Sequence, residues 1–353
     1  MSLLTSTMRT RVTRAVAVVT VALLGVSACG DDDVPSDATA AASTTAGPTA
    51  STPDTAPGTA PGTVPAESSP PETSADIGSS VEAANGTVTL DAQPVKIVSL
   101  SPTGTEMLFA IGAGEQVIAV DDQSNFPAEA EAVRSELSGY TPNVEAIAGY
   151  EPDLVVIADD FNNLGVQLAA LDIPVWSGPT AMSLDDVYSQ IEQLGTLTGH
   201  VADAAALVSD MRTAIEDELS ELPESEVPLT YYHELDPVYF SVTSNTFIGQ
   251  IYSLVGLRNI ADQAEATSDY PQLSSELIVS SNPDLIFLAD TKCCGESSES
   301  VASRDGWSGI AAVTNGAVIE MDDDIASRWG PRVVNYVAAV VDAVSALPQF
   351  AQG

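Results

Sequence analysis

The sequence predicts an α/β fold in which two similar βα lobes are joined by one long rigid helix, with a cleft between the lobes. Short apolar runs alternate with segments of helical period, which is typical of parallel strands covered by helices on both faces. The phrase "NVEAIAGYEPDLVVIA" at 143–158 returns as "SSELIVSSNPDLIFLA" at 274–289, which indicates a duplicated lobe. Between the two phrases, residues 183–222 keep one nearly unbroken helical period.

The N-terminal residues have the layout of a secretory signal. Three arginines precede the apolar run 15–26, which is shorter than the ~20 residues that a membrane-spanning helix needs. The run leads into "VSAC", which ends at Cys29. This stretch is similar to the bacterial lipobox, in which the cysteine becomes the lipidated first residue of the mature protein. Residues 1–28 are therefore predicted to be a lipoprotein signal peptide. A generic signal peptide with an incidental cysteine is the alternative.

Residues 29–92 are predicted to be a disordered tether. They are rich in proline, threonine, alanine and serine and contain no aromatic side chain. A chain of this composition cannot bury enough apolar area to offset the entropy lost on ordering. As a flexible coil, ~55 such residues reach on the order of 40 Å. The folded part is therefore expected to stand off a membrane surface while it remains bound to it.

The first lobe is assigned to residues 93–181. It begins with an apolar run, a helical segment and a second apolar run, which predict strand, helix and strand. A short helix then closes before Pro152, and a buried strand, a helix and a last strand follow. In order, these elements are expected at 95–100, 103–112, 116–121, 143–150, 153–158, 161–172 and 173–176.

The linking helix is assigned to residues 182–223 and the second lobe to residues 224–353. Ser183 is the expected N-cap of the linking helix, because its side chain can accept a hydrogen bond from the first turn. The second lobe echoes the first in order, so both are expected to contain Rossmann-like parallel sheets with a ligand between them. Its elements are expected at 229–235, 238–242, 246–256, 274–289, 317–321 and 331–347.

The composition excludes several classes of protein. A formal net charge of -39 leaves no basic surface for phosphate, so nucleic acid is not an expected partner. A receptor for bare metal ions surrounds its ion with several histidines and carboxylates, but the chain has two histidines. A hydrolase needs a nucleophile with a base, and the sequence lacks a G-x-S-x-G motif. We therefore expect neither catalysis nor a cofactor.

An ordered set of motifs carries a family resemblance. The block "KIVSLSPTGTEMLFAIGAGEQVIAVDD", the two repeated phrases, the long central helix and "SRWGPRVV" together resemble the helical-backbone (class III) substrate-binding proteins of ATP-driven importers. The resemblance covers Val95 to Leu347 and is closest to the cobalamin-binding members. It implies a monomer that binds its ligand between the lobes and delivers it to a permease dimer with a cytoplasmic ATPase. The expected location is the outer face of the cytoplasmic membrane, through the lipid anchor alone.

The resemblance orders the candidate ligands. A corrinoid is expected first, a ferric siderophore second, and haem third. A lipoprotein that has lost transport and serves as a sensor or an adhesin is the remaining alternative.

The resemblance also gives the repeated phrases a function. In that family one glutamate on each lobe meets arginines of the permease, and Glu145 and Glu276 match those positions. Each is expected in the first turn of its helix, after Asn143 or Ser274 as N-cap, where the helix dipole favours a carboxylate. A simple role as a helix-terminal charge is the alternative.

Loops at the strand ends supply the candidate ligand-binding residues, because ligands of parallel sheets bind at these ends. Aromatic residues make up only 5% of the chain, so their presence in these loops predicts a large planar or apolar ligand. His233 is a candidate for a metal centre or a ligand amide, or else a structural residue. Arg328 is expected to meet a carboxylate or phosphate, and Arg332 to anchor the last helix. The candidates are Ser101, Pro102, Thr103, Phe126, Tyr140, Phe161, His233, Ser244, Asn245, Arg328 and Trp329.

Cys293 and Cys294 are adjacent in a predicted loop. They can form a vicinal disulfide or remain a labile thiol pair. An adjacent pair alone does not predict a metal site.

Overall fold

The computed structural model describes residues 78–225, 227–264 and 267–350. All of them belong to one compact unit. The predicted signal peptide, Cys29 and most of the predicted tether lie outside the described residues. None of the helices in the described ranges has the length and apolar character needed to cross a bilayer.

The first lobe is built on a sheet of four parallel strands in the order β4-β3-β5-β6. Its central strands are buried on both faces, as expected for a parallel sheet between two helical layers. The strands are β3 (Ile97–Leu100), β4 (Val117–Val120), β5 (Leu154–Ile157) and β6 (Val175–Ser177). The helices are α1 (Pro102–Ala110), η1 (Ala113–Gln116), α2 (Ala128–Glu131), α3 (Val144–Ala148), η2 (Phe161–Asn163) and α4 (Leu164–Ala169).

The second lobe repeats this topology, with four parallel strands in the order β10-β9-β7-β8. In both lobes the first strand lies between the second and the third, and the fourth pairs with the third. The strands are β7 (Thr230–Glu234), β8 (Arg258–Asn259), β9 (Leu285–Leu288) and β10 (Val318–Glu320). The helices are α7 (Phe247–Leu254), η3 (Ile260–Gln263), α8 (Ser275–Ser281), α9 (Thr291–Cys294), α10 (Ser298–Ala302), η4 (Trp307–Gly309), α11 (Ala311–Thr314), α12 (Asp323–Ala326) and α13 (Val333–Ser345).

Local details confirm that the lobes are duplicates. The hydroxyl of Ser101 accepts a hydrogen bond from the Gly104 amide at 3.0 Å, and Thr246 caps α7 through the Gly249 amide at the same distance. Neither glycine has room for a side chain, because a Cβ would lie 2.6 Å from Val156 in one lobe and within van der Waals overlap of the backbone in the other. The predicted fold class of two similar βα lobes with parallel sheets is therefore confirmed.

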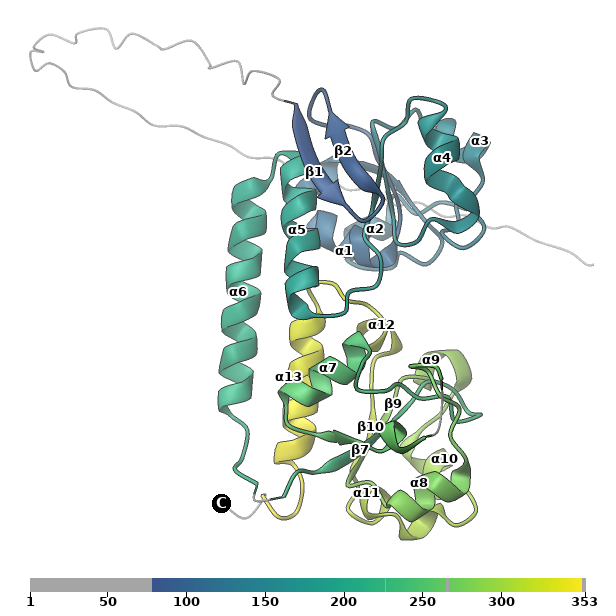
Figure 1. Cartoon of the computed structure of the whole chain (residues 1–353), viewed down its shortest axis with the longest axis vertical. Helices are drawn as coiled ribbons and strands as arrows, with labels where there is room; N and C mark the ends of the chain where they lie inside the picture. Colours follow the sequence, from purple (N-terminus) through teal and green to yellow (C-terminus); the bar gives the residue numbers. More distant parts are fainter. Residues whose placement is uncertain (1–77, 226, 265–266, 351–353) are drawn as a thin grey trace, which may run out of the picture. The chain divides into compact units, whose positions relative to one another are not determined.

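The predicted long helix at 183–222 differs in the structure, which has two helices there. α5 (Leu184–Thr198) and α6 (Val201–Ser220) lie side by side (Figure 1). The chain turns at Gly199, which adopts a left-handed conformation at φ 80° and donates its amide to Gly195. Each helix buries its own apolar face, so the hydrophobic period continues across the turn and conceals it. α6, about 30 Å long, packs against α13 of the second lobe and makes the link.

The predicted tether extends too far toward the fold. Residues within its last part form an antiparallel hairpin of β1 (Ser79–Ala83) and β2 (Gly86–Leu90). Val88 and Leu90 alternate with exposed residues and are buried against the first lobe. Asn85, at the turn, donates from its amide to the Val175 carbonyl at 2.8 Å. The sequence does contain a hairpin signal here, an Asn-Gly pair between alternating apolar residues. A prediction from composition alone does not detect it.

The strand predicted at 238–242 is wrong. The side chain of Asp236 accepts hydrogen bonds from the amides of Val238 and Phe240. Tyr239 has a positive φ of 71°. An aspartate that binds the backbone two residues ahead favours a turn over an extended strand. The segment is a loop in which Phe240 forms an isolated bridge.

Candidate ligand-binding cleft

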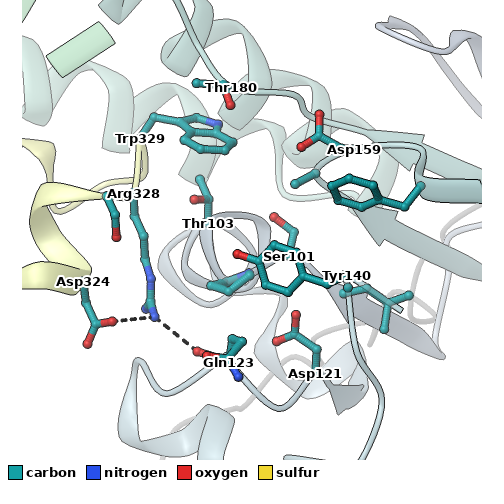
Figure 2. Close-up of a pocket in the computed structure, with 16 residues that line it drawn as sticks. Ser101, Thr103, Asp121, Gln123, Tyr140, Asp159, Thr180, Asp324, Arg328 and Trp329 are labelled. Carbon is teal, nitrogen blue, oxygen red and sulfur yellow. Dashed lines mark hydrogen bonds and ion pairs between the residues drawn. The ribbon is translucent and has the colours of Figure 1, made fainter. Parts of the chain in front are cut away.

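A cavity of ≈ 350 Å³ lies at the carboxyl ends of the strands of the first lobe, where the loop before α13 reaches it (Figure 2). This volume is within the range of small-molecule sites. The parallel sheet directs the loops after β3, β4 and β5 to one edge. The predicted residues that line the cavity are Ser101, Pro102, Thr103, Tyr140, Phe161, Arg328 and Trp329.

Aromatic side chains from different loops form walls of this cavity. Tyr140 and Phe161 form a pair with ring centroids 6.1 Å apart, and they are 71% and 40% exposed. Trp329 comes from the loop before α13 (Figure 2) and donates its indole N–H to Gln190 at 3.1 Å. That hydrogen bond fixes the indole, while two exposed rings offer their faces to a ligand.

Carboxylates make the cavity acidic. Asp121, Asp159 and Asp324 line it. Asp121 is 1% exposed, and burial raises the pKa of its carboxyl, although its hydrogen bonds with Ser124 oppose this. Asp121 directly follows β4, and Asp159 closely follows β5. The rule that ligands meet strand ends applies to Asp159 and could also have found Asp121.

Arg328 is held by protein groups. One of its terminal nitrogens donates to Glu106 at 2.9 Å and to Asn125 at 2.8 Å. The other donates to Asp324 at 2.9 Å and to the Gln123 carbonyl at 3.2 Å (Figure 2). The side chain is 9% exposed. The carboxylates that Arg328 meets thus belong to the protein itself.

Arg332 completes this contact at the start of α13. Its Nε and a terminal nitrogen donate to the two oxygens of Glu106 at 2.9 and 2.6 Å. Glu106 lies on α1 in the first lobe and its side chain is 1% exposed. One buried carboxylate therefore holds two arginines that precede α13. Sequence reasoning missed Glu106 because it falls in the middle of a helix.

His233 lies in the core of the second lobe rather than along the cavity. It is completely buried, and its Nδ1 is 2.8 Å from the hydroxyl of Tyr252. Burial lowers its pKa to about 3, so the imidazole is neutral at physiological pH. His233 therefore has the environment expected of a structural residue.

Three other candidates also lie apart from the cavity. Ser244 and Asn245 line a separate polar pocket with Asp262 and Asp269. Phe126 is 43% exposed and packs under the Arg332 guanidinium, 4.3 Å from its ring centroid. Ser244 and Asn245 lie in the long loop after β7, and the contact with Arg332 places Phe126. Neither feature could be predicted from the sequence.

A second, apolar cavity of ≈ 260 Å³ adjoins the first. The two share Thr180, Ser327, Arg328 and Trp329. Its other walls come from the second lobe and from α13, and include Phe247, Ile248, Ile325 and Val333. The loop that carries Trp329 thus has a polar chamber on one side and an apolar chamber on the other.

Glu145 and Glu276 occupy equivalent exposed positions. Each is the second residue of a short helix, α3 or α8. Asn143 caps α3 through the Ala146 amide at 3.0 Å, and Ser274 caps α8 in the same way at 3.1 Å. Both helices precede the third strand of their sheet, β5 or β9.

Comparison with known proteins places the chain among the periplasmic binding proteins. The family described as periplasmic binding protein matches residues 97–325. The cobalamin-binding protein of Halobacterium salinarum is 31% identical over 270 residues, which cover 74% of this chain and 72% of the relative. An uncharacterized ABC transporter substrate-binding lipoprotein of Bacillus subtilis is 30% identical, with 74% and 84% covered. The crystal structure of the periplasmic vitamin B12 binding protein of Vibrio cholerae is 24% identical with a TM-score of 0.60, over 74% of this chain and 99% of that one.

Proposed function

The chain belongs to the periplasmic binding protein family, and from this premise we propose that it captures a corrinoid in the interlobe cleft and delivers it to the permease of an ABC importer. The observation that carries the choice of ligand is the cavity itself, which combines aromatic walls with an excess of carboxylates. Relatives named for cobalamin and vitamin B12 support the same choice.

The charge of the cavity selects against anionic ligands. Among the described residues that line it, Arg328 is the only cation, and Glu106 and Asp324 neutralise it. Asp159 and Asp121 add carboxyl groups at the same surface. A ligand with several negative charges would meet repulsion without a free arginine to offset it. Catecholate ferric siderophores and the propionates of haem are disfavoured on this ground.

The same groups suit a large macrocycle with peripheral amides. Tyr140, Phe161 and Trp329 can stack against the faces of a planar ring. The carboxylate of Asp159 and the hydroxyl of Thr103 can accept hydrogen bonds from amide N–H groups. Because the polar and apolar chambers meet at Trp329, a ligand larger than one chamber can extend across both.

Delivery and anchoring complete the proposal. Glu145 and Glu276 present one exposed carboxylate on each duplicated lobe, which matches a permease of two subunits. Cys29 would carry the lipid and hold the protein at the outer face of the cytoplasmic membrane. We propose a monomeric receptor, because two lobes of one chain already supply both docking carboxylates.

A neutral ferric hydroxamate is the second candidate ligand. Its lack of negative charge agrees with the carboxylates of the cavity. Haem is the third candidate, because His233, the candidate for a metal centre, is buried away from the cavity.

Calorimetric titration of the full-length protein in detergent tests the proposal. Cyanocobalamin, a ferric hydroxamate, a ferric catecholate and haemin are titrated in parallel. We expect saturable binding of cyanocobalamin with a Kd of about 1 μM or lower, which corresponds to about -8 kcal/mol. Tight binding of a ferric chelate with no response to cyanocobalamin would contradict the proposed ligand but not the proposed role in an ABC importer.

A further inference from the structure

The vicinal cysteines are exposed and adjoin the loop that forms the cleft. Cys293 and Cys294 form a disulfide in the single turn of α9, which ends at Gly295 with φ 75°. Both residues are exposed to solvent. A disulfide between adjacent residues closes a small ring through their shared peptide bond, so it restricts the backbone of this turn more than two free thiols would.

Asp323 is the first residue of α12, which lies within the loop before α13, and it fastens α9 to that loop. Its carboxylate accepts hydrogen bonds from the amides of Thr291, Lys292 and Cys293 at 3.0, 2.9 and 3.0 Å. The Lys292 ammonium adds ion pairs of 2.7 Å with Asp322 and 3.0 Å with Asp324. One of the disulfide cysteines therefore donates its own amide to this loop.

The same loop holds the lobes together at the cavity. Asp324 accepts from Arg328 at 2.9 Å and from Asn125 of the first lobe at 3.1 Å. Arg328 in turn reaches Glu106 of the first lobe and lines the cavity. Hydrogen bonds therefore connect the Cys293 amide to Asp323 and Asp324 to the wall of the cavity, and the peptide bond between Asp323 and Asp324 joins the two sets of contacts.

We propose that Cys293 and Cys294 are a thiol–disulfide exchange site whose redox state sets ligand affinity. The predicted change in affinity rests on the proposed function. The predicted change in structure rests only on contacts within the protein. In the oxidised protein, Asp323 and Lys292 hold the loop and Arg328 in place. In the reduced protein, α9 relaxes, its amides leave Asp323, and the wall formed by Arg328 loosens.

The exchange step needs an external dithiol, either a small molecule or a protein. A thiolate of the dithiol attacks one sulfur, forms a mixed disulfide and expels the other cysteine as a thiolate, which takes a proton from water. The second thiol of the reagent then attacks the mixed disulfide. The cysteine pair gains two electrons and two protons, and the reagent becomes the disulfide. Exposure of both cysteines permits this attack.

The test compares the oxidised full-length protein with the protein treated with dithiothreitol. Maleimide labelling and peptide mass spectrometry establish whether Cys293 and Cys294 become free thiols. Hydrogen exchange then reports on the amides of residues 291–294 and 323–328, and titration with cyanocobalamin reports on affinity. We expect faster exchange at both segments and binding weaker by about fivefold or more after reduction.

The double variant Cys293→Ser/Cys294→Ser is the matched control. Because serine has nearly the shape of a reduced cysteine, the variant should match the reduced protein and should not respond to dithiothreitol. Reduction of the pair without any change in exchange at residues 323–328 would overturn the inference, as would an equal response of the serine variant. Failure of both redox forms to bind cyanocobalamin would contradict the proposed function instead, and the exchange rates would still decide the redox coupling.

Discussion

Asp159 and Asp290 occupy the same place in the two lobes, yet their surroundings are opposite. Each lies two residues beyond the third strand of its sheet, β5 or β9, at the end of the repeated phrase. Asp159 is exposed and lines the cavity. Asp290 is completely buried, and neither of its carboxylate oxygens has a hydrogen-bond partner among the described groups. The duplicated scaffold thus presents one strand end to a ligand and closes the other.

An ion network closes the strand end of the second lobe. Arg304 forms two hydrogen bonds of 2.6 Å with Glu234, the last residue of β7, and one of 2.7 Å with Glu296. Its guanidinium also lies 4.7 Å from the ring centroid of Trp307, which is fully buried. In the first lobe, β3 leads almost directly into α1, and the loops around it leave a cavity. Duplication therefore supplied the scaffold and the paired glutamates, while the loops alone decided which lobe carries the polar chamber.

Replacing Glu106 should disrupt the contact between the lobes most strongly. Glu106→Ala leaves Arg328 and Arg332 largely buried without their shared carboxylate, and this should lower the free energy of unfolding by about 3–5 kcal/mol. Urea denaturation of the purified variant measures the loss.

The control is Glu151→Ala, which removes an ion pair with Lys96 whose side chains are 84% and 43% exposed. That change should cost less than about 1 kcal/mol. Equal losses in the two variants would contradict a buried contact between the lobes.

Removing both repeated glutamates should separate transport from binding. In Glu145→Ala/Glu276→Ala, ligand-stimulated ATP hydrolysis by the reconstituted importer should fall by about tenfold or more, because each lobe loses its docking charge. Cyanocobalamin affinity should remain unchanged, since neither residue lines the cavity.

Glu299→Ala is the matched control, because Glu299 is also the second residue of a short exposed helix but lies outside the repeat. Normal ATP hydrolysis in the double variant would show that Glu145 and Glu276 do not dock the permease and serve only to stabilise their helices.

Substitutions of Trp329 and Trp307 should have opposite effects on affinity and stability. Trp329→Ala removes a wall shared by both chambers and should weaken cyanocobalamin binding about tenfold, or about 1.4 kcal/mol. Trp307→Phe leaves a ring in the core but removes the hydrogen bond to Ser275, so it should lower stability and preserve affinity. Paired titration and thermal unfolding distinguish the effects, and equal losses of affinity would count against the placement of the site.

Asp290 should make the stability of the protein depend on pH. Burial, followed by repulsion from Glu234 and Glu296, raises its pKa to about 7. Between the ordinary pKa of about 3.9 and pH 7 the folded state binds more protons than the unfolded state, so stability falls as the pH rises through this window. Asp290→Asn removes this dependence.

The variant should gain about 2–3 kcal/mol of stability relative to the unmodified protein when measured at pH 8 instead of pH 5. Denaturation of both proteins at the two values of pH gives the comparison. If the difference in the free energy of unfolding between the two proteins is the same at pH 5 and at pH 8, the folded state does not raise the pKa of Asp290.

Local signals in the sequence were enough to predict most of the fold. Apolar runs such as 97–100 and 285–288 form strands, because every side chain of a strand in a sheet covered on both faces can be apolar. Asn143 and Ser274 cap their helices as predicted. The turn at Gly199 was missed because both α5 and α6 bury apolar faces, so the period alone does not reveal a reversal. A glycine at a possible C-cap was the available signal.

The site was harder to predict because it depends on contacts between distant segments. Ser101 and Trp329, which line the cavity, could be named from the sequence because strand ends and loop aromatics are local features. Glu106 was missed, since its partners lie more than two hundred residues away. His233 was a plausible ligand at the end of a strand, but the hydroxyl of Tyr252 and complete burial hold it in the core.

The position of cobalt in a complex with cyanocobalamin tests the account most directly. Crystals of the protein grown with the ligand would be measured at the cobalt absorption edge, where anomalous scattering locates the metal without reference to the rest of the density. The account predicts one peak between Trp329 and the Tyr140–Phe161 pair, beside the carboxylate of Asp159. A peak in the polar pocket around Ser244 and Asp269, or an empty cleft under saturating ligand, would contradict it.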